Sequence, residues 1–221
     1  MKKLIAVLAA CLMAPIFAGA QGIEDGDHMF SMMLGAGAGL QDSGFQWGNE
    51  DVEWGKAGVV AGLSYMVFPS KFLGVGVEVN DGLFADDKHS AWVMGNHYEM
   101  INGMNVLNAM ASFRFNFNPD SRCRIYVPFG AGLSSATGVI EQKTNGNKHS
   151  ETATYNSLGW FAGVGLEIAL GSSGRWALGA EGRYNAFQFD TDKLLNKWGA
   201  AGVGKKDYSY LSAMFKASYR F

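Results

Sequence analysis

The sequence predicts an all-β protein whose eight antiparallel strands close into an up-and-down transmembrane β-barrel. Eight segments alternate apolar and polar residues with the two-residue period of a strand that has one apolar face. The connections between these segments alternate strictly between short turns and long loops, which is the layout of membrane barrels. The polar faces carry charged residues and many glycines, as a narrow closed interior requires.

The eight expected strands share one pattern, in which apolar residues occupy every second position. They are residues 29–40, 56–68, 72–84, about 100–117, 123 to about 135, 155–170, 175–187 and 208–221. The last segment shows the pattern most clearly, since Leu211, Phe215 and Phe221 share one face while Lys216 and Arg220 share the other. Taken alone, this segment favours the closing strand of a membrane barrel but is also compatible with an amphipathic edge strand of a soluble sheet, so the other segments and their connections decide between the two.

The connections support a membrane barrel. Three are short and rich in turn-forming residues: 69–71, 118–122 and 171–174. Four are long: 41–55, 85–98, 139–154 and 188–207. A sheet in a membrane must close on itself because every backbone donor and acceptor needs a partner there. The layout places both termini and the short turns in the periplasm, whereas a soluble sandwich has no reason to sort its loops in this way.

Aromatic residues are concentrated toward the ends of the expected strands. Phe72, Phe115 and Trp176 lie at one end, and Phe84, Trp160, Tyr184 and Phe187 lie toward the other. Such positions are typical of the aromatic girdles at the two membrane interfaces.

The N-terminal segment predicts export. Lys2 and Lys3 precede an apolar run over residues 4–17, and Ala18–Ala20 forms an A-x-A cleavage site. We therefore expect a signal peptide over residues 1–20, a periplasmic lead-in over 21–28 and the barrel over 29–221. An alternative remains open, in which residues 8–11 form a lipoprotein signal and Cys11 is acylated. The chain is exported in either case.

The composition narrows the possible partners. Without Lys2 and Lys3, 16 basic residues face 20 acidic ones, a formal charge of −4. This balance offers no basic face to nucleic acid. Cys123 is the only cysteine left after removal of the signal peptide, so no internal disulfide is expected. The sequence indicates no cofactor.

Charged residues on the polar faces predict a network inside the barrel. They are Glu78, Arg114, Glu167, Glu181, Arg183 and Lys216, with Arg124 and Arg220 on the same face. The interior of an eight-stranded barrel is just wide enough for side chains, so these charges are expected to pair across the lumen, with glycines making room for them. Alternation does not predict which charges pair, because strand register is unknown. A filled lumen argues against an open pore.

The whole segment after Gln21 resembles a small eight-stranded outer-membrane barrel of the OmpX, OmpA-transmembrane or opacity type. The resemblance is carried by the A-x-A site, by residues 74–79 (GVGVEV), by residues 163–185, and by the closing strand YLSAMFKASYRF, residues 210–221. It implies integral insertion in the bacterial outer membrane, among lipid and lipopolysaccharide. It also implies that the barrel-assembly machinery reads the last strand, with Phe215, Tyr219 and Phe221 as the assembly signal.

Candidate catalytic and metal-binding residues are few. Three histidines, His89, His97 and His149, lie in expected loops near acidic or hydroxyl residues, but the His-x-Ser spacing of outer-membrane deacylases is absent. The acidic residues at 50, 51 and 53 are candidates for a calcium site, although a solvated acidic loop is the favoured explanation. The glycine runs lie within strands and have no following helix, which excludes a nucleotide loop.

The sequence therefore favours a non-enzymatic surface barrel with a charge-filled lumen and long extracellular loops, acting in scaffolding, adhesion or envelope integrity. A channel for small or apolar solutes is the alternative, and a lipid-modifying enzyme at the outer rim is the third possibility. The loops are the expected contact with an extracellular ligand, but they contain no motif that identifies it.

Overall fold

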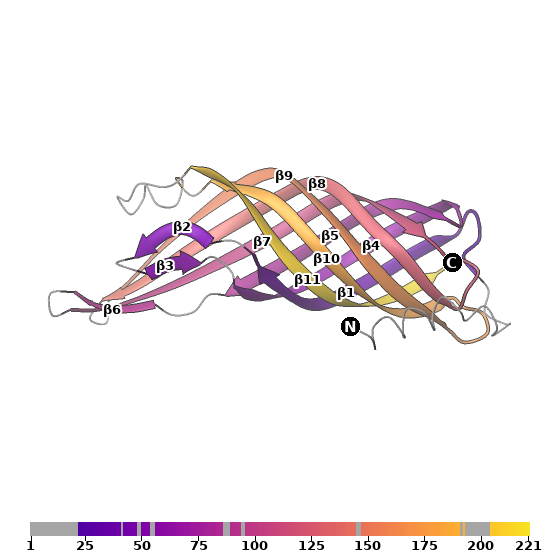
Figure 1. Ribbon diagram of the computed structural model, residues 1–221, viewed down its shortest axis with the longest axis horizontal. Coiled ribbons are helices and arrows are strands. Elements are labelled where there is room, and N and C mark those ends of the chain that lie inside the picture. The colour runs from indigo at the N-terminus through magenta and orange to yellow at the C-terminus, as the bar shows by residue number, and fades with distance from the viewer. Residues whose placement is uncertain are drawn as a thin grey trace, which may run out of the picture.

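The computed structural model (Figure 1) describes residues 22–40, 42–47, 50–53, 56–85, 89–93, 96–144, 147–190, 192 and 204–221. The expected signal peptide and Cys11 lie outside these residues. Eight long strands form the body of the molecule: β1 (His28–Gly39), β4 (Ala57–Ser70), β5 (Leu73–Ala85), β7 (Asn96–Asn116), β8 (Cys123–Thr144), β9 (Asn147–Leu170), β10 (Trp176–Asp190) and β11 (Lys205–Arg220).

The eight long strands form a closed antiparallel ring. Each pairs with its neighbours in the order β5-β4-β1-β11-β10-β9-β8-β7, and a further pairing of β5 with β7 completes the ring. The first and last strands lie side by side, in a register that runs from Met29 opposite Arg220 to Gly39 opposite Tyr210. The expected eight-stranded up-and-down barrel is thus confirmed, with the strands running obliquely around an elongated cylinder (Figure 1).

The expected long loops are wrong in part, because strand pairing continues far beyond the barrel wall. The segment 139–154 is a hairpin in which β8 extends to Thr144 and β9 begins at Asn147. The segment 85–98 contains β6 (His89–Val93) and the start of β7, and the segment 41–55 contains the paired β2 (Asp42–Trp47) and β3 (Glu50–Glu53). Outside a membrane both faces of a strand accept polar residues, so the apolar alternation that reveals a strand is lost. These strands project at the end opposite the short turns (Figure 1).

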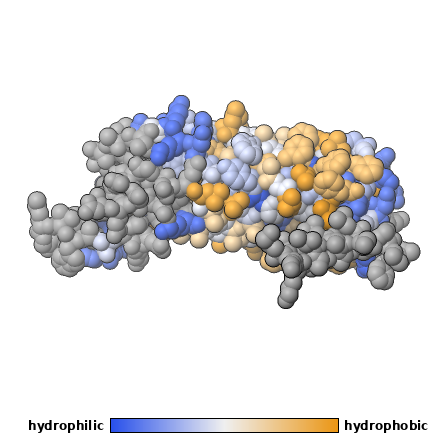
Figure 2. Space-filling model, in the orientation of Figure 1, coloured by the Kyte–Doolittle hydropathy of each residue, from blue (hydrophilic) through white to orange (hydrophobic). Residues whose placement is uncertain are grey.

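The outer face of the barrel is apolar. Large apolar side chains at every second position of the strands are exposed, among them Leu34, Leu63, Val77, Leu133 and Phe215. Figure 2 shows hydrophobic residues over the middle of the visible barrel and hydrophilic residues toward its ends. Exposure of such a large apolar surface to water is unfavourable, whereas contact with lipid hydrocarbon is favourable.

No helix among the described residues is long and apolar enough to cross a membrane.

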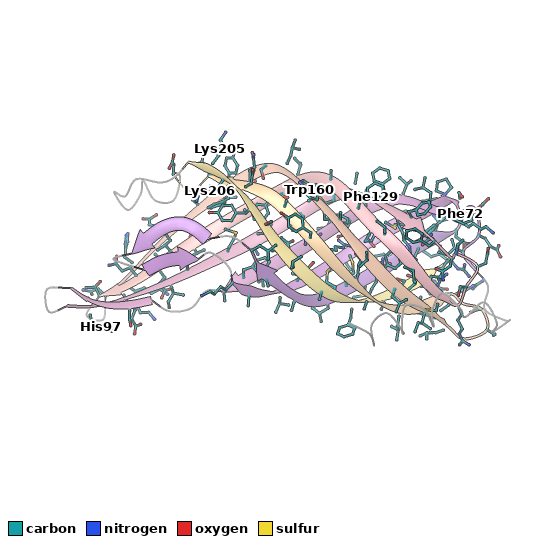
Figure 3. The ribbon with its side chains drawn as sticks, in the orientation of Figure 1. Phe72, His97, Phe129, Trp160, Lys205 and Lys206 are labelled. Carbon is teal, nitrogen blue, oxygen red and sulfur yellow. The ribbon has the colours of Figure 1, made fainter. Side chains whose placement is uncertain are left out.

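The aromatic girdles are only partly as expected. Phe72 is exposed at the short-turn end, and Trp160 is exposed farther toward the other end (Figure 3). Phe84 and Phe187 instead face the lumen, and only 6% and 5% of their surfaces are exposed. Both stand an odd number of positions from the lipid-facing residues of their strands, so alternation turns them inward.

The lumen is filled by three layers of side chains. At the short-turn end lies a small apolar cluster of Ile23, Met29, Met66 and Phe68. The middle layer is the charge belt, which comprises Glu78, Arg114, Arg124, Glu167, Glu181, Arg183 and Lys216. The layer toward the long loops, the apolar chamber, consists of Met33, Val60, Phe84, Met104, Val106, Ala136, Ile140, Phe187, Phe189, Tyr208, Tyr210 and Met214.

The residues before β1 cover the short-turn end of the lumen. Ile23 is buried there, and its backbone N–H donates to the carbonyl of Pro119 at 3.1 Å. Phe68 pairs with this segment through two backbone hydrogen bonds, from Gly26 N–H at 2.7 Å and to the Asp27 carbonyl at 2.8 Å. Arg220 donates to the Gly22 carbonyl and lies 3.1 Å from the Asp27 carboxylate. The expected lead-in is therefore packed under the barrel.

Candidate functional site

The first group of ion pairs in the charge belt is centred on Arg183 of β10. Its Nη2 donates to Glu78 Oε2 at 2.8 Å, and its Nη1 and Nε contact Glu78 Oε1 and Glu181 Oε1. The guanidinium lies 4.2 Å from the centre of the Phe161 ring. Because β5 stands on the opposite side of the ring from β10, the pair with Glu78 crosses the lumen.

The second group is centred on Glu167 of β9. Its two carboxylate oxygens each lie 2.8 Å from a terminal nitrogen of Arg114, which comes from β7. Arg124 of β8 stands directly opposite Glu167 in the strand register, and its Nε lies 3.0 Å from Glu167 Oε1. One carboxylate is therefore shared by two guanidinium groups from neighbouring strands.

Tyr126 joins the two groups. Its hydroxyl donates to Glu181 Oε2 at 2.7 Å, and its ring lies 3.7 Å below the guanidinium of Arg114. The Lys216 ammonium is 3.7 Å from Glu181 Oε2 and 5.1 Å from the same ring. Tyr126 is not among the lumen residues predicted from the sequence, although it follows Arg124 by two residues and alternation therefore places it on the same face.

Glycines on a neighbouring strand make room for these large side chains. A Cβ at Gly165 would lie 2.2 Å from the Tyr126 ring, and one at Gly163 would lie 2.9 Å from Cγ of Arg183. Both glycines come from the inner face of β9. The glycine-rich pattern of that strand therefore reflects close packing inside the barrel.

A polar ladder lies between the charge belt and the apolar chamber. Asn80 donates to Glu78 Oε1 at 2.8 Å and accepts a bond of the same length from Asn108. Asn108 also accepts a hydrogen bond from the Ser134 hydroxyl at 2.6 Å and donates to the Tyr210 hydroxyl at 3.3 Å. These amides satisfy the polar atoms that border the apolar chamber.

The geometry brings all six sequence-predicted lumen residues into one network and adds Arg124 and Tyr126 to it. None of the seven charged side chains has more than 4% of its surface exposed. Four cationic groups face three carboxylates in the belt, which leaves one positive charge in excess. The pair between Arg183 and Glu78 joins strands on opposite sides of the ring, so the network spans the lumen.

The histidines of the long-loop end do not form a catalytic group among the described side chains. His149 is exposed and lies 3.6 Å from Glu151 on the same face of β9, while Ser150 lies on the opposite face. His97 lies near the outer tip of the molecule (Figure 3). The side chains of His89, Glu50, Asp51 and Glu53 lie outside the described set, as does the calcium site proposed on the last three.

The projecting hairpin of β8 and β9 carries its own charges. Lys148 is 2.6 Å from Glu141, and Lys143 is 3.6 Å from the same carboxylate. The hydrogen bond from Lys148 lowers the pKa of Glu141 below its usual value. Such solvent-exposed pairs contribute little to stability, so they define the charge pattern of this surface rather than its fold.

Phe215 and Tyr219 of the expected assembly signal lie on the outer face of β11, and Phe221 directly follows this strand. Phe215 is 79% exposed. Tyr219 packs between Trp176 and Phe221, with ring centres 4.8 Å and 6.1 Å away. Phe221 exchanges two backbone hydrogen bonds with His28, at 2.9 Å and 3.0 Å, and stacks on its ring. These contacts lie on the seam where the last strand closes the ring.

Comparison with known proteins gives the family. The family model described as "Outer membrane protein beta-barrel domain" matches residues 4–221. The solved structure of OprG from Pseudomonas aeruginosa is similar with a TM-score of 0.54 and 13% sequence identity, covering 91% of this chain and 99% of that one.

Two further structures show a weaker likeness. Ail of Yersinia pestis, in complex with the heparin analogue sucrose octasulfate, has a TM-score of 0.49 and 16% identity, with 89% of this chain and 99% of that chain covered. Neisserial surface protein A has a TM-score of 0.45 and 15% identity, with coverages of 89% and 98%. No curated protein matches the sequence. Because the family model spans nearly the whole chain, the protein belongs to the outer membrane protein β-barrel family and is an integral β-barrel of the bacterial outer membrane.

Proposed function

We propose that this protein is a non-enzymatic surface barrel whose closed lumen acts as a rigid support for its extracellular strands, in a scaffolding, adhesion or envelope-integrity role. The single observation that carries this proposal is the charge belt. Arg183 reaches across the lumen to Glu78, and Arg114 and Arg124 share Glu167. We expect such a network to rigidify the barrel and to obstruct an aqueous path through it.

The projecting strands support the surface role. In outer-membrane barrels the short turns face the periplasm and the long loops face outward. The hairpin of β8 and β9 extends the wall outward as a paired sheet, with exposed residues from Asn147 to Ser150 at its tip. A paired hairpin presents side chains to a partner at lower entropic cost than a flexible loop. Outer-leaflet lipopolysaccharide and an extracellular ligand are the proposed partners of this end.

A truncated hairpin tests the surface role. Replacing residues 141–150 by an Asn-Gly turn joins Ile140 to Glu151, which stand opposite each other in the register. The variant should assemble normally, because the barrel wall is unchanged, and should keep its shift in gel mobility on boiling. Cells carrying it should match a strain lacking the protein, either in reduced attachment to laminin-coated plastic or in raised sensitivity to SDS.

The matched control replaces Ser172 and Ser173 in a short turn by alanine and should behave as the parent. If the strain lacking the protein attaches to laminin and resists SDS as well as the parent does, the surface role is wrong.

We further propose that residues 1–20 are a cleaved signal peptide and that Phe215, Tyr219 and Phe221 are read by the barrel-assembly machinery. The exposure of Phe215 and the position of Phe221 on the closing seam support this proposal. A strand that presents an apolar face before closure is a suitable target for such recognition.

A second candidate function is the transfer of small apolar molecules. It is favoured by one observation, the apolar chamber in the outer half of the lumen. The charge belt stands between this chamber and the periplasm, so passage along the full axis is disfavoured. Binding within the chamber is the part of this candidate that the geometry supports.

A further inference from the structure

A carboxyl group interrupts the apolar outer face of the barrel. Asp81 of β5 is partly buried and stands between Val79 and Leu83, two exposed side chains that face lipid. Its direct partners in the strand register are Ala61 of β4 and Leu107 of β7, which share the same outer face. An ionisable side chain within a membrane is costly, and those that occur usually serve a function.

The protein leaves part of this carboxyl group without a partner. Asp81 Oδ1 is buried and has no hydrogen-bond partner among the described residues. Glu78, three residues earlier on the same strand, faces the lumen instead and is bonded to Arg183 and Asn80. A buried acceptor without a donor is unfavourable, so Asp81 calls for a donor from outside the chain.

Asp81 lies at one end of an apolar groove in the outer face. The groove has a volume of about 710 Å³, within the range of small-molecule sites. It crosses β5, β4, β1, β11 and β10, and Ala61, Leu34 and Phe215 line it in the same register row as Asp81. The small side chain of Ala61 leaves space next to the carboxyl group. The groove therefore joins an apolar channel to one hydrogen-bond acceptor.

The groove runs obliquely between the two ends of the barrel. At one end lies Leu178, two residues after Trp176, whose ring packs on Tyr219 near the short turns. At the other end lies Asp81, four residues before Ala85, where β5 ends toward the long loops. Because the long loops face outward in such barrels, the carboxyl group is at the end of the groove nearer the outer leaflet.

We propose that this groove binds one acyl chain of an outer-leaflet lipopolysaccharide, with an amide N–H or 3-hydroxyl group of the lipid anchor donating a hydrogen bond to Asp81. These donors are attached at the top of the acyl chains, just below the sugar head group, and the chain beyond them is apolar. The ester groups of a phospholipid offer only acceptors at that depth. The ammonium groups of the periplasmic leaflet lie beyond the opposite end of the groove.

A second copy of the chain is a less suitable occupant. A two-fold contact centred on Asp81 would bring two carboxyl groups together, which is unfavourable. The lipid site lies on the membrane face of the wall, so it goes beyond the proposed surface role and does not depend on the extracellular strands.

Native mass spectrometry of the purified protein, released from phosphatidylcholine nanodiscs, tests this site. The probe is a deep-rough lipopolysaccharide, which has the lipid anchor and little sugar. Titration of the probe into the nanodiscs should saturate at one retained molecule per barrel. Phosphatidylethanolamine at the same molar fraction should not be retained above the level of phosphatidylcholine.

Two variants separate the hydrogen bond from the groove. Asp81→Leu removes the acceptor, and its dissociation constant for the probe should rise about tenfold, the effect of one hydrogen bond to a charged group. Its melting temperature in phosphatidylcholine alone should rise, because an unpaired carboxyl group no longer faces lipid. Ala61→Leu keeps the carboxyl group but fills the groove, and should also weaken binding. Ala131→Leu is the matched control, since it lies on the lipid face of β8, which contributes no residue to this groove.

Three results would overturn the proposal. The first is an equal dissociation constant for the probe in Asp81→Leu and the parent protein. The second is equal retention of phosphatidylethanolamine and lipopolysaccharide, which would reduce the groove to a general lipid contact. The third is a dimer of the parent, absent in Asp81→Leu, in nanodiscs without lipopolysaccharide, which would assign Asp81 to a contact between two copies.

Discussion

Replacing Arg183 by alanine should lower the free energy of unfolding by about 3–5 kcal/mol, the usual effect of removing one partner of a buried ion pair. Arg183 supplies the only cationic contact of Glu78 within 4.0 Å in the described part of the chain, so its removal leaves that carboxylate buried with only the amide of Asn80. Glu181 keeps Lys216 and Tyr126. The measurement is equilibrium unfolding in urea in the presence of lipid vesicles.

Two variants control this prediction. Arg114→Ala should be less harmful, since Glu167 keeps Arg124 at 3.0 Å. Lys71→Ala removes an exposed pair with Asp120 and should change stability by at most about 1 kcal/mol. Equal losses of stability in Arg183→Ala, Arg114→Ala and Lys71→Ala would contradict the prediction, because buried and exposed ion pairs would then contribute equally. A double variant with Arg183→Met and Glu78→Gln should recover much of the loss, because Glu78 is then neutral and Glu181 keeps Lys216 as its partner.

Deleting Phe221 should abolish assembly in cells, as should replacing Phe215 and Tyr219 by aspartate. The deletion removes two backbone hydrogen bonds to His28 and the aromatic contact that the machinery is proposed to read. The measurement is the fraction of protein in the outer membrane that shifts in gel mobility on boiling. That fraction should fall to the background of an unassembled chain.

Leu34→Asp separates the loss of recognition by the assembly machinery from the cost of placing a charge in lipid. Leu34 stands directly opposite Phe215 in the register of β1 and β11, and its side chain also faces lipid. A charge at either position costs up to a few kcal/mol, depending on depth. Phe215→Asp and Leu34→Asp should refold equally well into vesicles that lack the machinery. In cells, Phe215→Asp should be the more severe change, and equal assembly of the two would contradict the assembly-signal role.

The closed ring could be predicted because the lipid imposes a strict pattern on the outer face. Every second residue of a membrane-spanning strand must be apolar, and Leu34, Val77 and Phe215 follow that rule. The partners in the lumen could not be predicted, since the unknown register between β8 and β9 decides whether Glu167 and Arg124 stand opposite each other. Glu181 and Arg183 are the exception, because residues two apart on one strand always share a face.

The apolar chamber was not predicted, because aromatic residues near strand ends are typical of interfacial girdles. Phe84 and Phe187 were assigned to a girdle on that basis, although the alternation along β5 and β10 turns them inward. The extension of β8 to Thr144 was missed for a different reason. Beyond the membrane, hydrogen bonds such as the 2.9 Å contact between the Thr137 and Thr154 hydroxyls support the hairpin, and they leave no apolar period in the sequence.

The most direct test of the closed lumen is the conductance of the purified protein in planar lipid bilayers in molar potassium chloride. A lumen filled by the charge belt, with Ile23 buried beneath it, predicts no stable current steps. Arg114→Ala should then lower the thermal stability far more than it changes the current. Uniform, long-lived steps from the wild-type protein would contradict the closed lumen and identify the barrel as a porin.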